Sequence, residues 1–314
     1  MKIIIPVAGK GTRLRPHTYS KPKPFVRVGS TTPIEYIINH VLTLNPKEII
    51  IVTDKYNDDA FKERLPKIYP KVKFKFAIQE EPLGTAHVIT CAKEFIKSGD
   101  EILINYCDTM FVKDLSCLNK LKENDGVIFA REVEDYSRFG VIVHDENNIM
   151  TKMVEKPDEP ISKLANIGSY YIKDGFEFMK YAQQVVDEDI RVKGELFLTE
   201  SFRLMIEDGK KLYVEDIEDW LDTGKIETLL ETNAKLLKGK TWKGTNVKIK
   251  DSNIGANVSI GKNTTLKNCK IENSIIGEDT TLEGLEIKDS VIGDNVNLKK
   301  DGKVFNIGDT CSIN

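Results

Sequence analysis

A stretch near the amino terminus combines glycines and basic side chains in a way that could bind an anion. Gly9 to Arg13 (GKGTR) directly follow the apolar run at residues 2–8. Glycines let backbone N–H groups approach a phosphate closely, and the Arg13 guanidinium can hold phosphate oxygens through two parallel hydrogen bonds. A tight turn alone would also explain the glycines, so the arginine is the more specific sign of a site for a phosphate-bearing ligand.

More basic residues follow over residues 15–23. Lys23 lies between two prolines, whose rings restrict the backbone, so its ammonium group can be presented from a stiff segment. The stretch is neither a Walker A loop, since no Gly-Lys-Ser/Thr follows at the required spacing, nor a GxGxxG dinucleotide fingerprint. We interpret the other basic side chains here as solvated: Lys10, Arg15 and Lys21.

Two aspartates could bind a divalent cation beside phosphates. Asp108 ends the strand-like run at residues 101–108, and Asp222 lies in WLDTG, just before a helical pattern. Mg²⁺ takes one or two carboxylates from a protein and its remaining oxygens from substrate and water. Each aspartate also has an ordinary explanation that stays open, because Asp108 could cap a turn and Asp222 could cap the helix.

The elements that must position these residues alternate between strand and helix patterns. Continuous or alternating apolar runs predict strands at residues 2–8, 48–54, 72–79 and 101–108. Helical spacing, weaker around Pro66, predicts helices at residues 33–44, 58–69 and 84–96. This order predicts an α/β fold with an open, mostly parallel Rossmann-like sheet and helices on both faces. Ligands of such sheets lie beyond the carboxyl ends of the strands, where the opening stretch, Gln79 and Asp108 fall.

The remainder of the chain predicts additions to this sheet and then a different architecture. Strand patterns from about residue 126 are followed by helical patterns at residues 174–188, 198–208 and 224–238. We interpret these as strands added to the same sheet, with their helices. Beyond residue 240 single apolar residues recur about every six positions between Asn, Asp, Gly and Thr, which predicts a hexapeptide-repeat β-helix of few coils. The predicted domains are residues 1–240 and 241–314.

Composition excludes several classes of protein. The 314 residues are 40% hydrophobic and 30% charged, and a net charge of −3 gives no general attraction to nucleic acid or to anionic membranes. Five scattered cysteines without a CxxC pair favour reduced thiols in a cytoplasmic protein over a disulfide framework or a zinc site. The first apolar run is too short for a secretory signal or a membrane span.

Taken together, the motifs resemble those of the sugar-1-phosphate nucleotidylyltransferases. The order and approximate spacing match over roughly residues 1–240: AGKGTRLRPHT, KPKP, Q with PLGTAH, Asp108, VEKP, NIG, KGE and WLDTG. The tail resembles that of the long-form glucose-1-phosphate thymidylyltransferases, which carry a left-handed β-helix. The implied reaction is Mg²⁺-dependent transfer of a nucleotidyl group from a nucleoside triphosphate, dTTP or UTP, to a sugar 1-phosphate, glucose 1-phosphate, with release of pyrophosphate.

The resemblance also implies roles for individual residues. Arg13 would act on the departing pyrophosphate, Lys23 would contact phosphate at the reacting centre, and Asp108 and Asp222 would bind Mg²⁺. The implied nucleotide-binding residues are Ala8, Gly9, Gly11, Thr12, Arg13, Gln79, Gly84, Thr85 and Asp108. The implied sugar-phosphate-binding residues are Glu155, Lys156, Asn166, Gly168 and Lys193.

The sequence departs from the family pattern at three places. Ala8 stands where many members have glycine, and Lys193 stands where many have arginine, which keeps the charge but loses the planar fork. VRVGSTTP at residues 26–33 replaces the more usual VPVAGKP. These departures put the sugar preference and the role of the 26–33 loop in question.

Three alternatives remain at this point. One is a guanylyl- or other nucleotidylyltransferase of the same fold that uses mannose 1-phosphate or another sugar phosphate. Another is a non-catalytic regulatory subunit that binds sugar nucleotides, although the metal-binding acids and the loop arginine are present. The third is an additional acetyltransferase activity of the tail, which the absence of histidine beyond His144 disfavours. A homo-oligomer, formed through the flat faces of the β-helix, is the expected assembly.

Overall fold

The computed structural model describes residues 1–9, 11–121, 123–299, 306–309 and 312–313, and divides into two compact units. Unit 1 comprises residues 1–9 and 37–220, and unit 2 comprises residues 10–36 and 221–314. The boundaries fall inside helix α1 (Pro33–Leu42) and strand β11 (Asp219–Asp222). Each unit is described separately.

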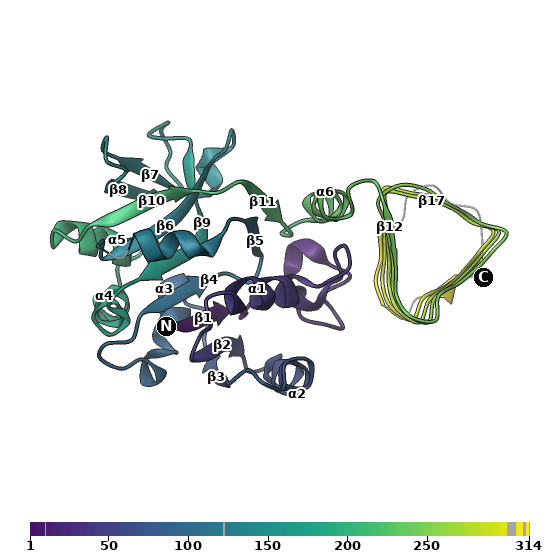
Figure 1. Cartoon of the computed structure of the whole chain (residues 1–314), viewed down its shortest axis with the longest axis horizontal. Coiled ribbons are helices and arrows are strands. Elements are labelled where there is room, and N and C mark those ends of the chain that lie inside the picture. Colours follow the sequence, from purple (N-terminus) through teal and green to yellow (C-terminus); the bar gives the residue numbers. More distant parts are fainter. Residues whose placement is uncertain (10, 122, 300–305, 310–311, 314) are drawn as a thin grey trace. The chain divides into compact units, whose positions relative to one another are not determined.

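A mixed, mostly parallel sheet organises unit 1 (Figure 1). Its strand order is β10-β6-β9-β4-β1-β2-β3, with β7 and β8 joined beside β9. Only β9 runs antiparallel to its neighbours β4 and β6 on the main path. The strands are β1 (Lys2–Pro6), β2 (Glu48–Asp54), β3 (Phe74–Gln79), β4 (Ile102–Asn105), β6 (Gly126–Glu132), β7 (Gly140–His144), β8 (Met150–Glu155), β9 (Leu164–Ile172) and β10 (Leu212–Asp216); the short strand β5 is Thr109–Val112.

The apolar runs of the sequence become the buried centre of this sheet. Ile3, Ile4 and Ile5 of β1 are fully buried, and so are residues 49–52 of β2. A strand covered on both faces needs apolar side chains at consecutive positions, which explains these uninterrupted runs. The prediction of an open, mainly parallel sheet, extended by strands from the second part of the chain, is confirmed.

Helices cover the sheet, and α3 packs against α4, which packs against α5. The helices of unit 1 beyond the shared α1 are α2 (Asp58–Ile68), α3 (Thr85–Thr90), α4 (Gly175–Asp187) and α5 (Leu198–Glu207), with short 3₁₀ turns η3 (Lys93–Phe95), η4 (Leu115–Lys120) and η5 (Tyr136–Arg138). The helix predicted over residues 84–96 is therefore shorter than expected and continues only as η3. The strand predicted over residues 101–108 ends at Asn105, so Asp108 lies in the turn between β4 and β5.

Unit 2 begins with the glycine-rich segment and continues with a helix and a β-helix. The segment contains two 3₁₀ turns, η1 (Thr12–Leu14) and η2 (Lys23–Phe25). Helix α6 (Ile226–Leu237) follows β11. In Figure 1 the residues beyond 240 form a coil of triangular outline, built from three sheets of short parallel strands.

The three sides of the β-helix are short parallel sheets. One contains β12 (Thr241–Lys243), β15 (Val258–Ile260), β18 (Ile275–Ile276), β21 (Val291–Ile292) and β23 (Asn306–Ile307). The second contains β13 (Lys248–Lys250), β16 (Thr265–Lys267), β19 (Thr281–Glu283), β22 (Asn297–Lys299) and β24 (Ser312–Ile313). The third contains β14 (Asn253–Ile254), β17 (Lys270–Glu272) and β20 (Glu286–Lys288).

Apolar ladders fill the β-helix. Leu266 pairs with Leu282 and Leu282 with Leu298, and all three are buried, so each coil stacks the same side chain on the next. Most corners are occupied by Asn or Asp with positive φ, a conformation that these two side chains tolerate better than others: Asn246, Asp251, Asn257, Asn263, Asn268, Asn273, Asp279, Asp289 and Asn295. The predicted β-helix is confirmed.

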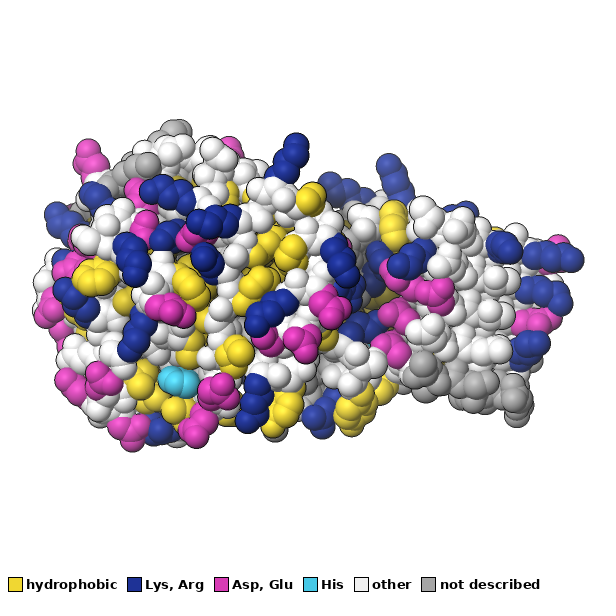
Figure 2. Space-filling model, turned by 90° about the horizontal axis from the view of Figure 1, so that it is seen from below, with side chains coloured by type: hydrophobic (Ala, Val, Ile, Leu, Met, Phe, Trp, Pro, Cys, Tyr) yellow, Lys and Arg dark blue, Asp and Glu magenta, His cyan; other side chains and the backbone are white. Residues whose placement is uncertain are grey.

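The distribution of charge on the surface and the state of the cysteines match the expectations from composition. On the face in Figure 2, acidic and basic side chains are interspersed. No disulfide joins any two of the described cysteines, Cys91, Cys107, Cys117 and Cys269, and Cys311 lies outside the described residues. Within the described part of the chain, no helix has the length and apolar character needed to cross a membrane.

Candidate active site

The first predicted site residues of unit 1 follow strand β1. The Ala8 N–H donates to the carbonyl of Val52 at 3.1 Å, which continues the pairing of β1 with β2. The Gly9 N–H then donates to Oδ2 of Asp54 at 3.4 Å. Gly9 has a φ of 144°, and a Cβ there would meet no atom within 4 Å. The backbone at Gly9 is therefore free of neighbouring atoms on its Cβ side, as a site for a close ligand requires.

Gln79 and Gly84 lie together at the end of β3. The Gln79 side chain is buried, and its Nε2 lies 3.4 Å from the Gly84 carbonyl and 3.1 Å from Nδ1 of His87. Gly84 has a φ of 136°, and a Cβ there would lie 2.3 Å from the Leu196 carbonyl oxygen. Only glycine fits this close approach, which fixes the amide of Gln79 beside the start of α3.

Thr85 links this region to two buried tyrosines. Its hydroxyl accepts the N–H of Leu198 at 2.8 Å. Burial raises the pKa of Tyr106, and hydrogen bonding to the Thr85 side chain lowers it in part. The Tyr106 ring meets the Tyr170 ring edge-on, with centroids 5.9 Å apart. Strand β9 is thereby held against the turn that contains Asp108.

Gly168 and Asn166 lie on β9 next to these tyrosines. Gly168 has a φ of 84°, its carbonyl accepts the Tyr106 N–H at 2.9 Å, and a Cβ on it would lie 2.5 Å from the Tyr106 ring. The Asn166 side chain donates to the Gly140 carbonyl at 2.9 Å and accepts the hydroxyl hydrogen of Tyr170. Asn166 is therefore fixed at both ends of its amide.

Glu155, Asn166 and Thr199 converge on Gly140. A Cβ on Gly140 would lie 2.4 Å from Asn166 Nδ2, 2.8 Å from Glu155 Oε2 and 2.9 Å from the Thr199 methyl carbon. The Thr199 hydroxyl is buried and lies beside the Glu155 carboxylate, whose pKa it lowers.

The electrostatic surroundings of Glu155 are unfavourable to its charge. Burial raises the pKa of this carboxyl, and the nearby Glu195 and Glu200 raise it further, whereas Thr199 and Lys156 lower it. Hydrogen-bond donors from a sugar would stabilise the carboxylate, since hydrogen bonding to a charged form favours that form.

The two lysines predicted to bind the sugar phosphate differ in their settings. The Lys156 ammonium lies 4.4 Å from the centroid of the Phe197 ring, and its backbone has a φ of 44°. The Lys193 ammonium is exposed and pairs with Asp158 at 2.8 Å. Its neighbour Glu195 lies near enough to Glu155 to affect the pKa of that carboxyl. The KGE segment is thus near the Glu155 cluster, with Lys193 directed to Asp158.

In unit 2 the glycine-rich segment folds back on itself. The carbonyl of Gly11 accepts the Thr18 hydroxyl hydrogen at 2.8 Å. Gly11 has a φ of 57°, and a Cβ there would lie 3.1 Å from both the Cβ of Lys23 and the Cγ2 of Thr18. The segment therefore brings Gly11 and Lys23 together, as a phosphate-binding loop would require.

Arg13 and Asp222 both lie near Gly224 within unit 2. A Cβ placed on Gly224 would lie 2.9 Å from Asp222 Oδ1 and 3.6 Å from Arg13 Nη2. The Gly224 N–H donates to the same Asp222 oxygen at 2.8 Å. The Thr232 hydroxyl of α6 donates to the Asp222 carbonyl at 2.7 Å. Helix α6 thereby holds Asp222 beside the guanidinium of Arg13.

One interpretation of the basic stretch is wrong. Lys21 is not solvated, because its side chain is only 16% exposed and its ammonium pairs with Asp294 and, at 3.4 Å, with Asp309. Arg15 lies over the Tyr19 ring at 5.0 Å, and Lys10 is outside the described residues. The partners of Lys21 are some 270 to 290 residues away in the sequence, so the pattern around Lys21 could not indicate them.

Comparison with known proteins decides the family. The family model described as nucleotidyl transferase matches residues 2–239, which is most of the chain. The chain belongs to the nucleotidyl transferase family. It is therefore a nucleotidyltransferase, and the predicted family is confirmed at this level.

Several curated proteins are similar to this nucleotidyltransferase. A low-salt glycan biosynthesis nucleotidyltransferase, Agl11 of Haloferax volcanii, is 28% identical over 83% of this chain and 73% of its own length. A bifunctional sugar-1-phosphate nucleotidylyltransferase/acetyltransferase of Sulfurisphaera tokodaii is 30% identical over 74% of this chain and 55% of its own. A mannose-1-phosphate guanyltransferase of Candida albicans is 32% identical over 73% and 63%. The chain thus spans less than two thirds of two of these relatives.

Solved structures share the fold of this nucleotidyltransferase. A putative glucose-1-phosphate thymidylyltransferase of Bacillus anthracis, in complex with a sucrose, superposes with a TM-score of 0.65 at 24% identity, covering 75% of this chain and 95% of its own. A UDP-glucose pyrophosphorylase complexed with UDP-glucose gives a TM-score of 0.64 at 23% identity. At these identities the likeness concerns the fold.

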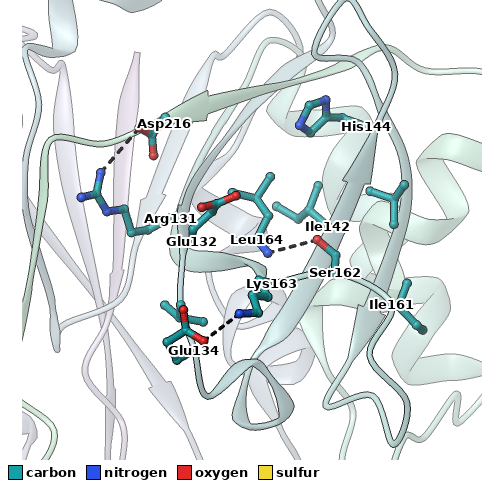
Figure 3. Close-up of a pocket in the computed structure, with 12 residues that line it drawn as sticks. Arg131, Glu132, Glu134, Ile142, His144, Ile161, Ser162, Lys163, Leu164 and Asp216 are labelled. Carbon is teal, nitrogen blue, oxygen red and sulfur yellow. Dashed lines mark hydrogen bonds and ion pairs between the residues drawn. The ribbon is translucent and has the colours of Figure 1, made fainter.

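A hollow on unit 1 of the nucleotidyltransferase is separate from the residues above (Figure 3). It has a volume of about 770 Å³ and lies beside β6, β7 and the start of β9. Arg131 pairs with Asp216 at 3.5 Å, and Lys163 pairs with Glu134 at 2.7 Å. None of the residues that line the hollow is a predicted site residue, so the hollow is not assigned to the reaction.

Sequence reasoning missed four residues of the Glu155 region. Gly140, Thr199, Tyr106 and Tyr170 carried no motif that distinguished them. Gly140 could have been suspected because it begins a strand pattern directly opposite VEKP, with which it pairs in an antiparallel hairpin. The other three are recognisable only from the packing of β9 and α5.

Proposed function

We propose that this nucleotidyltransferase transfers a nucleotidyl group from dTTP or UTP to glucose 1-phosphate, giving a nucleoside diphosphate sugar and pyrophosphate. The named activities of the relatives, which act on sugar 1-phosphates, support this class of acceptor. The base and the sugar rest on the motifs around Gln79 and Glu155. Mannose 1-phosphate with a guanine nucleotide is the second candidate, since the Candida albicans relative is named for it.

The observation that carries the proposal is that each unit contains a cluster of polar residues suited to one of the two substrates. In unit 1, Glu155, Asn166 and Thr199 form a polar cluster around Gly140, suited to a sugar. In unit 2, Arg13 and Asp222 both lie near Gly224, in the same unit as the glycine-rich segment. One set of residues fits the acceptor and the other fits the triphosphate.

The reaction requires little covalent chemistry from the protein. The phosphate oxygen of the sugar 1-phosphate is already a nucleophile, so no general base is needed. It attacks the α-phosphorus in line, the new P–O bond forms, and the bond to pyrophosphate breaks with its electron pair. Catalysis then consists of positioning and charge neutralisation. Arg13 stabilises the leaving pyrophosphate, Lys23 the reacting phosphate, and Lys156 the phosphate of the sugar.

We propose Mg²⁺ as the cofactor, because the resemblance assigns it to Asp108 and Asp222. Asp108 and Asp222 would hold it, because Mg²⁺ in phosphate sites takes one or two carboxylates and completes its shell with substrate oxygens and water. The Gly224 N–H holds the Asp222 carboxylate through a hydrogen bond of 2.8 Å. When bound, the ion neutralises negative charge on the phosphates.

The direct test is pyrophosphate release from a panel of nucleotides and sugar phosphates. The purified chain is mixed with Mg²⁺, each of the four common nucleoside triphosphates and several sugar 1-phosphates. We expect turnover with a pyrimidine nucleotide and glucose 1-phosphate, and a loss of more than about a hundredfold in Asp108→Asn and Asp222→Asn. Binding of sugar nucleotide without any turnover would instead support a non-catalytic regulatory subunit.

The cellular setting is proposed with the activity. Nucleoside triphosphates and sugar phosphates are cytoplasmic metabolites, and the lack of disulfides among the described cysteines is compatible with a reducing compartment. We propose a cytoplasmic homo-oligomer, which light scattering of the purified protein would test. The handedness of the β-helix and the roles of the individual site residues are part of the same proposal.

A further inference from the structure

Three acidic residues form a ladder on the β-helix. Glu278, Asp294 and Asp309 each follow an Ile-Gly pair in successive coils. Asp294 Oδ1 accepts the Glu278 N–H at 2.8 Å, and Asp309 Oδ1 accepts the Asp294 N–H at 2.7 Å. Each of these two carboxylates is therefore fixed by the coil before it. We call these three residues the acidic ladder.

Basic residues of the glycine-rich segment lie on this ladder. The Lys21 ammonium pairs with Asp294 and Asp309, and Nη2 of Arg27 donates to Glu278 Oε1 at 2.7 Å. The Lys21 and Arg27 side chains are only 16% and 19% exposed. These pairs are thus less accessible to water than ordinary surface ion pairs, which contribute little to stability.

Apolar and backbone contacts reinforce the ion pairs. The guanidinium of Arg27 lies 4.6 Å from the ring centroid of Trp242 in the first strand of the β-helix. A Cβ on Gly308 would lie 2.9 Å from the Pro16 Cβ, so glycine allows the last described coil to approach the segment closely. Contacts therefore extend along the segment from Pro16 to Arg27.

Asn233 of α6 forms a further, buried joint. Its Oδ1 accepts the Gly29 N–H at 2.9 Å and the Ser259 hydroxyl hydrogen at 2.6 Å. Its Nδ2 donates to the Asn257 carbonyl at 2.9 Å. The loop at residues 26–33, whose role the sequence left in question, is thus tied to both α6 and the β-helix.

We infer that the β-helix positions the segment at residues 11–29, with Lys21 and Arg27 as positioning residues that act through Lys23 and Arg13. Lys23 lies between the two anchors in the sequence, and Arg13 precedes the Pro16 contact by three residues. A β-helix is rigid because each coil is hydrogen-bonded to the next, so it supports a loop better than solvent does. The inference rests on the proposed function for the roles of Arg13 and Lys23.

The test removes the ion pairs from either side. In Lys21→Gln and in the double variant Asp294→Asn/Asp309→Asn, we expect kcat to fall about tenfold, since displacing a catalytic group by about 1 Å can cost up to about a hundredfold. The KM for the sugar phosphate stays unchanged, because the sugar is held by unit 1. Hydrogen exchange of the amides at residues 11–29 becomes faster in both variants. Circular dichroism verifies that they fold.

A matched control comes from another side of the same β-helix. Glu283 of β19 pairs with Lys267 and, at 3.5 Å, with Lys299, both on neighbouring coils. Glu283→Gln also removes one inter-coil carboxylate, but Glu283 makes no ion pair with the described residues of the 11–29 segment. We expect its kcat and its amide exchange in that segment to equal those of the wild type.

Conservative and exchanged variants separate positioning from mere stability. Arg27→Lys retains the charge and should recover most of the kcat that Arg27→Gln loses. Lys21→Asp combined with Asp294→Lys should restore protection of the 11–29 amides relative to Lys21→Asp alone.

Two results would overturn the inference. One is wild-type kcat together with wild-type exchange in Lys21→Gln; the other is a change in oligomer mass, seen by light scattering, with kcat intact. If the wild type turned out to lack transferase activity, the exchange experiment would still decide whether the ladder orders the loop, so failure of the proposed function is distinguishable.

Discussion

At the scale of single residues, the surroundings of Glu155 destabilise its charged form. A carboxyl that is largely buried, with two further glutamates nearby, is less stable as an anion than it would be in water. The neighbouring Thr199 hydroxyl offsets part of this cost through a hydrogen bond to the carboxyl. Under the proposed function, the same group that lowers stability in the free protein would bind the hydroxyls of the sugar.

Glu155→Gln should stabilise the protein at neutral pH and weaken substrate binding. Because the pKa of Glu155 is raised in the folded state, the folded chain binds this proton more tightly than the unfolded chain does. Stability is therefore lost as the pH rises from the unfolded pKa through the folded one. The variant lacks this loss, so its thermal midpoint should exceed that of the wild type at pH 7 and match it at low pH.

The same variant should raise the KM for the sugar phosphate about ten- to a hundredfold, the effect of losing a hydrogen bond to a charged group. Thermal melts between about pH 4 and pH 8, together with steady-state kinetics, provide the measurement. A lower midpoint at pH 7 combined with an unchanged KM would contradict both parts.

Gly84→Ala should be far more damaging than a comparable glycine replacement elsewhere. Its Cβ would lie 2.3 Å from a carbonyl oxygen, so the backbone of α3 or of Leu196 must move. We expect a loss of more than about 2 kcal/mol in the free energy of unfolding. Gly209, at the end of α5, also has positive φ, but a Cβ there would meet nothing within 4 Å; Gly209→Ala should cost about 1 kcal/mol. Urea denaturation of both variants compares them, and equal losses would disprove the close-contact explanation.

Single residues were predictable where a motif was local and not where a partner was distant. Gly9, Gly11 and Arg13 could be proposed as phosphate-binding residues because a buried strand precedes a glycine-rich turn, and this stays a prediction. Lys21 was assigned to solvent because its partners, Asp294 and Asp309, lie on the last coils of the chain. The importance of Thr199 depends on how α5 packs near β8, which the residue types alone do not specify.

At the scale of elements, the regular repeats explain both the sheet and the β-helix. The four apolar runs of the first 108 residues predicted the parallel strands, because a strand that is buried on both faces has apolar residues at consecutive positions. Helix α3 was overestimated, since the apolar spacing continues beyond Thr90 while the chain turns into η3. The coil length of 15 to 17 residues, slightly less than three hexapeptides, follows from pairs such as Trp242 with Ser259, Leu266 with Leu282 and Leu298 with Ile313.

Leu282→Ala should weaken the β-helix strongly. Leu282 is fully buried between Leu266 and Leu298, so its removal leaves a cavity that the stacked coils cannot fill. The expected loss is about 3 kcal/mol in the free energy of unfolding. Glu286→Ala, on the exposed side of β20, serves as the control and should change it by less than about 0.5 kcal/mol. Calorimetry would detect the difference; a transition unaltered by Leu282→Ala would rule out a tightly packed centre.

At the scale of the whole molecule, charge is mixed rather than concentrated. The net charge is −3 and both signs are interspersed on the face shown in Figure 2. Attraction of two anionic substrates must therefore come from a few local cations, which dissolved salt can screen.

The kcat/KM for the nucleotide should fall roughly tenfold as sodium chloride rises from about 0.05 M to about 0.5 M. The kcat should change less, because Arg13 and Lys23 act at short range once the substrate is bound. Initial rates at a fixed Mg²⁺ concentration provide the measurement, with potassium acetate as a second salt to exclude a specific chloride effect. A kcat/KM independent of both salts would show that binding does not depend on accessible cations.

The ion pairs of the acidic ladder depend on the distance between successive coils of the β-helix. Neighbouring strands of a parallel sheet, and so neighbouring coils, lie about 4.8 Å apart. Arg27 pairs with Glu278 on one coil, and Lys21 pairs with Asp294 and Asp309 on the next two. Insertion of one extra coil between Gly277 and Gly293 would move Asp294 a full step away from Glu278, and the loop could no longer hold both. A variant with one additional coil at this place should therefore lose the ion pair of either Lys21 or Arg27.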